Sequence, residues 1–373
     1  MKFKFTPGSQ SKFAELLKAA ASKDVEVSKQ ANEVFASVIS SSLSRVLDPQ
    51  SYSARIFGEA LTYDGENPPE IPLDPYFNLP DGAFKIWSNG FPGGLAYNEV
   101  SGNDYFRFRT VHMDTAIAWN RSYVESSVLP NIVERHIARL MDEMLLKIDY
   151  LAFSVLAEAL GGAQTYGQSH VISSTAKLAG APRKFQLDDI SRLITKEKLL
   201  NASFANGTSR SATGGVDLLL LSPFSMEEVR RMVYNPMNTT AIPNTDESTA
   251  MPLPDELRME VFRSGGASSL FGKELLELTE MSAGYPYSQL FRNPAYYTAA
   301  GLPTWGPTEE LVVGINTGMN AFARVVRTDG DGNSLRLQPD DQHTARSRKT
   351  GYFVEWEGSF AGGNDRSIVG LVW

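Results

Sequence analysis

The stretch "SSVLPNIVERHIARLMDEMLLKIDYLAFSVLAEALGG", residues 126–162, holds the strongest periodic pattern in this sequence. Its apolar residues recur at helical spacing and form one stripe: Val133, Ile137, Leu140, Met141, Met144, Ile148, Leu151, Val155 and Ala159. Pro130 suits the first turn of a helix, and Gly161-Gly162 suits its end. At about 1.5 Å per residue such a helix is on the order of 50 Å long, so we predict a structural strut over about residues 127–160.

The residues before this helix have a different composition. Six prolines fall between Pro68 and Pro92, mixed with turn-forming pairs such as Asp81-Gly82 and Asn89-Gly90. An excursion of this length without helical pattern is unusual in a compact domain. We interpret residues 60–104 as a long hairpin that leaves the body of the protein and returns along the alternating strand "DYFRFRTVHM".

Flanking segments complete the pattern. Residues 1–47 read as an amphipathic helical stretch in which Val27, Ala31, Phe35 and Val38 share a face. After a polar loop that ends at residue 215, "VDLLLLSP" has the continuous apolar run of a fully buried strand. Five strand-like segments follow residue 310: "ELVVGI", "AFARVVRT", "NSLRLQ", "GYFVEWEG" and "SIVGLVW".

The helix "MEEVRRMV" follows the buried strand directly. We predict that Ser225 and Glu228 form a capping box at its start. Strand, turn and helix in quick succession indicate an α/β unit.

Composition limits the classes of function. An apolar fraction of 42% and a charged fraction of 21% in 373 residues are typical of a globular protein. The net charge of −8 disfavours general attraction to nucleic acid or to an anionic membrane. The absence of cysteine excludes disulfides, thiolate metal sites and a cysteine nucleophile, and makes a reducing compartment the default expectation. We expect no signal peptide and no membrane span, since no apolar run approaches 18 residues.

One pair of carboxylates has suggestive geometry. In "GYFVEWEGSF", residues 351–360, Glu355 and Glu357 point to the same face of a strand, roughly 6.5 to 7 Å apart. That separation is near the range in which two carboxylates share the acid and base roles of glycoside hydrolysis. Charged residues that alternate along a strand are more often a solvated face, and we favour that interpretation.

Metal and phosphate motifs are weak or missing. Residues 329–340 resemble the start of a calcium loop, with Asp329, Asp331 and Asn333 at alternate positions, but Ser334 and Asp340 replace the expected glycine and glutamate. A hairpin turn explains the Asp-Gly pairs without a metal. The four histidines have no metal-like spacing, and no phosphate loop, dinucleotide fingerprint or nucleophile elbow occurs. We therefore predict no catalytic, cofactor-binding or metal-binding residues.

The order of the parts resembles the major capsid protein of tailed bacteriophages, with the Hong Kong ninety-seven-like fold. The stretches that carry the resemblance are "NIVERHIARLMDEMLLKIDYLAFSVL", "VDLLLLSPFSMEEVRRM", "SSLFGKELLELTEM", "LVVGINTGMNAFARVVR" and "TGYFVEWEGSFAGGNDRSIVGLVW". The resemblance covers most of residues 50–373 and implies an α+β protein. Its expected parts are an N-terminal arm (1–50), an extended hairpin and its base (51–110), a peripheral domain with the spine helix (111–213), an axial α/β domain (214–320) and returning strands shared by both domains (321–373).

This resemblance implies a structural function without enzymatic activity. The expected subunit assembles into hexamers and pentamers of an icosahedral shell around double-stranded DNA, in a virion assembled in the host cytoplasm. Its expected partners are other copies of itself, portal, scaffolding and possible decoration proteins, and non-specific DNA contacts, with no cofactor. Two alternatives stay open: an encapsulin-like nanocompartment shell, and a carboxylate-dependent glycoside hydrolase that uses Glu355 and Glu357.

Overall fold

The computed structural model describes most of the chain outside its loops. The described residues are 15–16, 19–20, 25–65, 67–72, 105–120, 130–162, 164–165, 168–174, 185–204, 215–234, 255–264, 269–293, 309–317, 321–339, 349–363 and 365–373. Most of the expected hairpin, residues 73–104, lies outside them. None of the described helices is long and apolar enough to cross a membrane.

The chain forms two compact units, each built from separate segments. The first unit comprises residues 1–70, 107–151 and 323–361, and the second comprises residues 71–106, 152–322 and 362–373. Each unit therefore contains strands that are far apart in the sequence.

The first unit is organised around the long strand β14 (Lys349–Gly362). Strand β4 (Val111–Asn120) pairs with it antiparallel, from Val111 opposite Gly358 to Asn120 opposite Lys349. Strands β13 (Leu335–Pro339) and β12 (Phe322–Arg327) also pair with β14. Strand β1 (Ala60–Tyr63) adds to β12 in parallel and completes the sheet.

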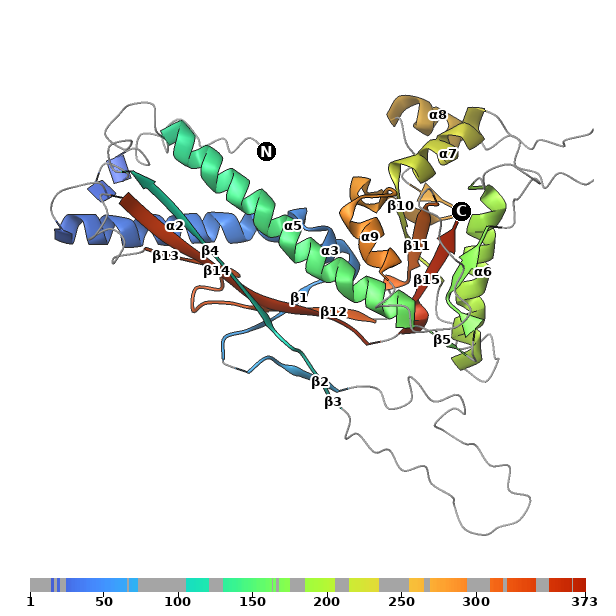
Figure 1. Cartoon of the computed structure of the whole chain (residues 1–373), viewed down its shortest axis with the longest axis horizontal. Coiled ribbons are helices and arrows are strands. Elements are labelled where there is room, and N and C mark those ends of the chain that lie inside the picture. Colours follow the sequence, from blue (N-terminus) through green and yellow to red (C-terminus); the bar gives the residue numbers. More distant parts are fainter. Residues whose placement is uncertain are drawn as a thin grey trace, which may run out of the picture. The chain divides into compact units, whose positions relative to one another are not determined.

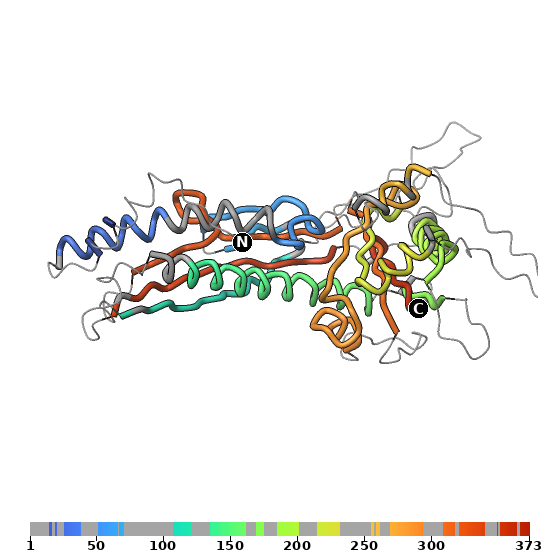
Figure 2. The backbone as a smooth tube through the Cα atoms, turned by 90° about the horizontal axis from the view of Figure 1, so that it is seen from above, coloured from blue at the N-terminus to red at the C-terminus, as the bar shows by residue number. Residues whose placement is uncertain are grey.

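Three helical segments belong to the same unit as this sheet. They are α2 (Val25–Gln50), α3 (Tyr52–Phe57) and the N-terminal part of α5 (Pro130–Gly162). The ring of Phe35 on α2 lies 5.2 Å from that of Tyr352 on β14, and the Tyr352 hydroxyl donates to Asn32 Oδ1 at 2.6 Å. Figure 1 and Figure 2 both show α5 running alongside β4 and β14.

The buried carboxylate of Asp149 on α5 caps the start of α3. It accepts hydrogen bonds from Ser51 Oγ at 2.7 Å and from the backbone N–H groups of Ser53 and Tyr52 at 3.1 and 3.4 Å. The two backbone N–H groups are among the donors that the first turn of a helix leaves unpaired. Burial raises the pKa of Asp149, although its hydrogen bonds oppose the shift.

The second unit contains a sheet of order β7-β15-β11-β8-β10-β9. The bounds are β7 (Val171–Ser173), β8 (Leu218–Leu221), β9 (Ser269–Leu270), β10 (Lys273–Glu277), β11 (Leu311–Ile315) and β15 (Ile368–Val372). Every residue of β8, β11 and β15 is buried. This confirms the prediction of a fully buried strand for β8 and of strands for the segments that form β11 and β15.

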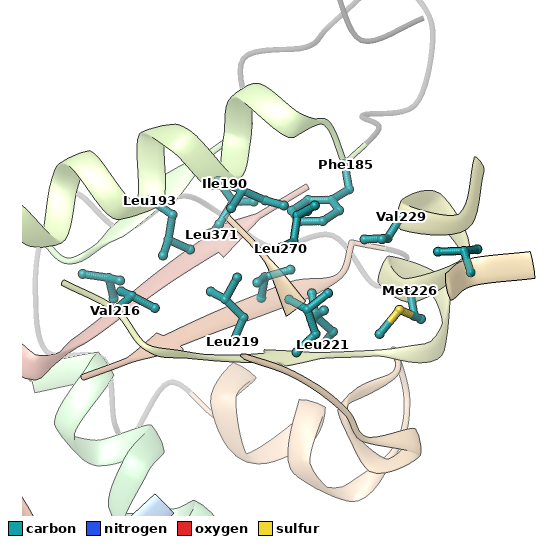
Figure 3. Close-up of a cluster of buried hydrophobic side chains, with 14 of the residues drawn as sticks. Phe185, Ile190, Leu193, Val216, Leu219, Leu221, Met226, Val229, Leu270 and Leu371 are labelled. Atoms are coloured by element: carbon teal, nitrogen blue, oxygen red, sulfur yellow. The ribbon is translucent and has the colours of Figure 1, made fainter. Parts of the chain in front are cut away.

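Helices α6 (Leu187–Phe204), α7 (Pro223–Tyr234) and α8 (Asp255–Ser264) contribute to the core of this unit. Figure 3 shows the cluster, in which Leu193 of α6 and Met226 of α7 point toward Leu219 and Leu221 of β8. The C-terminal part of α5 packs with α9 (Pro286–Arg292), where Phe153 stacks on Tyr287 at a centroid distance of 4.0 Å.

The remaining elements are short. They are β2 (Glu70–Pro72), which pairs with β3 (Tyr105–Arg107), β5 (Gln164–Thr165), which pairs with β6 (Gln168–Ser169), and the 3-10 turns η1 (Thr279–Met281) and η3 (Asp365–Ser367). The pair β2–β3 flanks residues 73–104, as expected for the base of a hairpin. The predicted single returning strand is instead two strands, because the backbone leaves strand conformation at residues 108–110, where Phe108 is buried.

Two local predictions about helices were wrong. The cap of α7 is Ser222, whose Oγ accepts from the Ser225 backbone N–H at 3.1 Å, because Pro223 occupies the first helical position. In the second half of α5 the buried residues are Ala152, Phe153, Leu156, Ala157 and Leu160, and the predicted stripe residues Leu151, Val155 and Ala159 are half-buried. This half of the helix belongs to the second unit and packs against different partners.

The predicted apolar face of the N-terminal helix is only partly correct. Ala31 and Phe35 of α2 are buried, but Val27 and Val38 are exposed together with Val34. These three valines are seven and four residues apart, so they form an exposed stripe on one side of α2.

Candidate functional site

Strand β14 separates an apolar side from a polar side, as the alternation predicts. Tyr352, Val354 and Trp356 are buried, whereas Glu355 and Glu357 are half-buried on the other side. The two glutamates therefore share a face of the sheet in the first unit.

Neighbouring strands place further polar residues beside them. Glu355 lies opposite Arg336 on β13 and opposite Asp114 on β4. Glu357 lies opposite His112 on β4. Directly opposed residues of paired strands project to the same face, so this side of the sheet collects charges of both signs.

Both oxygens of the Glu357 carboxylate are engaged. Oε1 accepts from the Tyr63 hydroxyl at 3.1 Å, and Oε2 accepts from Arg327 Nη1 at 2.8 Å. Partial burial acts to raise the pKa of Glu357, but the hydrogen bonds and charge of Arg327 together with the Tyr63 hydroxyl hold this pKa below its ordinary value. Burial and the hydrogen bond to Glu357 raise the pKa of Tyr63 to about 12. Glu357 is therefore an ionised acceptor in a fixed position.

A cavity of about 270 Å³ lies over this face. The connection between β12 and β13 forms one wall, and the other walls include Asp64, His112, Arg336, Glu355 and Glu357. Four carboxylates and two guanidinium groups line it in total. We call this the sheet cavity.

The candidate calcium loop forms that wall, and its geometry is that of a turn. The Asp329 carboxylate accepts from the backbone N–H groups of Asp331 and Asn333 at 3.1 and 2.7 Å and from Asn333 Nδ2 at 3.3 Å. Gly332 has a φ of 79°, a conformation that favours glycine. Asp340 lies outside the described residues. Within the described ranges, no group of three or more His, Asp and Glu residues is arranged to hold a metal ion.

The histidines do not meet at one site. His112 lines the sheet cavity of the first unit. His170 is buried in the second unit with its Nδ1 at 3.2 Å from the Ile368 carbonyl. His136 is exposed on α5, and His343 lies outside the described residues.

The chemistry of the cavity bears on the glycoside hydrolase alternative. That reaction needs one carboxylic acid that stays protonated and a second carboxylate that is free to act as base or nucleophile. Glu357 does not fit the role of the protonated acid, because its pKa is lowered, and both of its oxygens already accept hydrogen bonds from Tyr63 and Arg327. Glu357 is ion-paired with Arg327 on this sheet face, and Glu355 lies on the same face between Arg336 and Asp114 of the neighbouring strands.

Sequence reasoning missed the residues that donate hydrogen bonds to Glu357. Tyr63 and Arg327 lie on β1 and β12, far from β14 in the chain, and only the pairing of these strands brings them together. The alternation of "AFARVVRT" could have indicated that Arg324 and Arg327 point to opposite faces, and Arg324 does point elsewhere, donating from Nε to the Gly58 carbonyl at 2.8 Å.

Comparisons with known proteins find similarity among solved structures. No protein-family model matches the chain, and no curated protein sequence matches it. Among solved structures, it is similar to the capsid of an empty GTA particle (TM-score 0.49, 12% identity, covering 86% of this chain and 89% of that one). It is also similar to the mature capsid of bacteriophage PhiM1 (TM-score 0.49, 10% identity, 86% of each chain). A third similar structure is the holo-SrpI encapsulin complex from Synechococcus elongatus (TM-score 0.39, 12% identity, 72% of this chain and 75% of that one).

The similar structures are mostly phage capsids. The chain itself mixes helices and strands, which is the α+β class expected from the sequence.

Proposed function

We propose that this chain is a major capsid subunit of a tailed bacteriophage, which assembles with copies of itself into an icosahedral shell. The observation that carries the proposal is the order of elements along the chain. The helix α2, the paired strands β2 and β3, the 33-residue helix α5, the inserted strand–helix unit β8–α7 and the returning strands β11 to β15 follow one another in the order that the sequence resemblance implies.

Two further observations support a structural role. The exposed stripe of Val27, Val34 and Val38 on α2 is a small apolar surface that a neighbouring subunit could cover. In the candidate pair of carboxylates, Glu357 is held by an ion pair with Arg327 and a hydrogen bond from Tyr63, which suits a polar sheet face.

The proposal includes finer expectations. The subunits form hexamers and pentamers around double-stranded DNA, in a virion assembled in the host cytoplasm, together with portal, scaffolding and possible decoration proteins. The division into arm, hairpin, peripheral domain and axial domain belongs to the same proposal. The net charge of −8 supports DNA contacts that are non-specific and weak.

Assembly of the purified chain tests the proposal. We expect light scattering and negative-stain images to show rings of five and six subunits or closed shells, over a range of salt and crowding conditions. A uniformly monomeric protein of 41.0 kDa under all of these conditions contradicts it. Particles isolated from the native source should contain nuclease-protected double-stranded DNA; a bound cargo protein in its place indicates a nanocompartment.

Hydrogen exchange tests the role of the hairpin. If residues 60–104 lie over neighbouring subunits, their amides should exchange faster in the free subunit than in the assembled particle. Equal and strong protection in both forms means that the segment packs within its own subunit.

A further inference from the structure

Strand β4 leaves one side of the first sheet open. Its ten residues pair with β14, and no other strand pairs with it in the part of the chain that the structure describes. Figure 2 shows β4, in teal, at the margin of the sheet. The other edge strands of this sheet, β1 and β13, have only four and five residues. A long edge strand presents a row of backbone N–H and C=O groups that can pair with another extended chain.

The composition of β4 does not protect this edge against pairing. Edge strands that stay unpaired are commonly short or carry lysine or proline. The sequence of β4, "VHMDTAIAWN", contains neither lysine nor proline, and its one acidic residue is Asp114. The edge therefore suits an extended strand as its partner.

Asp114 indicates the charge that this partner strand should carry. It lies directly opposite Glu355 on β14, and Glu355 lies opposite Arg336 on β13. Like charges that face each other directly destabilise a sheet. Within the described ranges, the Asp114 carboxylate has no ion pair and no hydrogen bond. A cation opposite Asp114, on a strand added to the open edge, would offset this repulsion.

The other face of β4 indicates which residues should alternate with the cation. Met113, Thr115 and Ile117 are half-buried, on the face that β4 shares with the buried residues of β14. Apolar side chains on an added strand would cover these three residues further. The partner is therefore an extended segment in which basic and apolar residues alternate.

The chain itself contains such a segment. In "MKFKFTPG", residues 1–8, Lys2 and Lys4 alternate with Phe3 and Phe5. These residues lie outside the described part of the chain. Alternation of this kind with aromatic residues is typical of a strand, and Pro7 limits its length, because proline cannot donate to the ladder.

A second stretch with this alternation, "FRFR" at residues 106–109, is already in use within the subunit. Arg107 on β3 forms an ion pair with Glu70 at 2.6 Å, and Phe108 is buried. This leaves residues 2–6 as the segment that fits the open edge.

We propose that residues 2–6 of a second copy of this chain add to β4 as an antiparallel strand, with Lys4 opposite Asp114. This proposal rests on the proposed function as a self-assembling subunit. Each copy carries both the open edge and the segment, so the contact can repeat from one copy to the next and close into a ring. In this register Lys2 lies opposite Ala116, and Phe3 and Phe5 lie on the face of Met113.

Charge reversal tests the proposal directly. Asp114→Lys places a cation opposite Glu355 and repels Lys4 of the second copy. We expect an equal or higher thermal midpoint, because a like-charge pair is removed, and at least about tenfold higher protein concentration for half-assembly. Lys4→Glu should cause a similar loss. The combination of both substitutions should assemble within about threefold of the wild-type concentration.

Two results of this experiment overturn the proposal. One is assembly of either single variant at the wild-type concentration. The other is failure of the combined variant to recover, because the two charges then do not face each other.

Asp64 provides a matched control. It is an exposed carboxylate of the same unit and follows β1, at another edge of the sheet. We expect Asp64→Lys to assemble within about twofold of the wild-type concentration, since most surface substitutions have small effects. An equal loss of assembly in this variant means that any charge reversal on this unit is disruptive, and the specific role of Asp114 is overturned.

Disulfide trapping separates the failure of this proposal from the failure of the proposed function. The chain has no cysteine, so each introduced cysteine reports one contact. Tagged chains with Lys2→Cys are mixed with untagged chains with Ala116→Cys and oxidised. In the control mixture, Leu199→Cys replaces Ala116→Cys, because Leu199 is 62% exposed on α6.

Mixed dimers from Lys2→Cys with Ala116→Cys, and not from the control mixture, support the proposal even if no rings or shells form and the proposed function fails. Shells without these specific dimers overturn the proposal and leave the proposed function intact. A monomeric chain without them overturns both. A chain that carries both Lys2→Cys and Ala116→Cys gives one more check: an internal disulfide without mixed dimers means that the segment adds to its own copy, which overturns the proposal.

Discussion

At the scale of single residues, Trp356 is the buried counterpart of the two glutamates on β14. Its ring fills the space beside Gly358, where an added Cβ would lie only 2.6 Å from the ring carbons. We expect Trp356→Ala to lower the free energy of unfolding by about 3 to 5 kcal/mol, because the substitution leaves a cavity in the core. Urea unfolding, or the amount of soluble protein where the variant does not stay folded, measures this loss. A loss under about 1 kcal/mol would mean that the ring contributes little to the core.

The glutamates themselves should tolerate substitution. Glu357→Gln removes the charge that pairs with Arg327 in a partly exposed position, so we expect a loss of only about 0 to 1 kcal/mol. Glu355→Gln should be at least as mild, and both variants should stay soluble and form particles. Assays on a polysaccharide panel provide the check: hydrolysis by the wild type that disappears in Glu355→Gln contradicts the structural interpretation.

Asp149 should make the stability of the protein depend on pH. Because burial raises its pKa above the ordinary value of 3.8, the folded state binds more protons than the unfolded state between these two values. The contribution of Asp149 to the free energy of unfolding is therefore fully present below pH 3.8. It is lost as the pH rises through the pKa of Asp149 in the folded state. We expect the free energy of unfolding of the wild type to decline relative to that of Asp149→Asn over this interval. Urea unfolding of both proteins at a series of pH values measures the difference, and a constant difference contradicts the prediction.

At the scale of elements, the close packing of β11 against its neighbours in the second unit depends on Gly314. A Cβ atom there would lie 2.6 Å from Leu193 Cδ2 and 3.1 Å from both methyl groups of Val216. We expect Gly314→Ala to cost about 1 to 3 kcal/mol of unfolding free energy through overpacking. Gly330→Ala, in the connection between β12 and β13, is the control, because nothing lies within 4 Å of its added Cβ. Thermal unfolding should give a lower midpoint for Gly314→Ala than for Gly330→Ala. Equal midpoints would contradict the expected overpacking at Gly314.

Elements with a continuous or strictly alternating pattern could be predicted from the sequence. The buried runs of β8, β11 and β15 and the alternation of β14 each depend on one local pattern. The burial of α5 changes part-way because its two halves belong to different units, and a single stripe drawn from periodicity cannot describe that change. The positive φ of Phe271, in the turn between β9 and β10, could not be predicted either, because its sequence context indicates a strand with a glycine.

At the scale of the whole molecule, the features that could not be predicted from the sequence depend on the pairing of segments that are far apart in the chain. The sheet cavity depends on the pairing of β4 with β14 and of β1 with β12, and none of these pairs is local. The candidate pair Glu355 and Glu357 was correctly placed on one face, but its chemistry could not be predicted, because Arg327 and Tyr63 come from other parts of the chain.

Removal of the C-terminal segment should affect both units. β14 is the central strand of the first sheet, and β15 lies between β7 and β11 in the second. We expect a chain that ends before Lys349 to lose cooperative unfolding and to accumulate as insoluble protein. A soluble product with a cooperative transition would show that one unit folds without these strands. Removal of residues 1–14, which lie before the first described helical residues, is the matched control for shortening of the chain.

The position of β14 and β15 after the strands with which they pair has a consequence for synthesis. A ribosome makes the chain from the N-terminus, so α2, β4 and most of α5 emerge long before the strands against which they pack. Neither sheet is complete before β14 and β15 are made, although β8 can already pair with β10 and β11. Closure of the first sheet is therefore expected to follow the synthesis of β14, long after α2, β4 and α5 have left the ribosome.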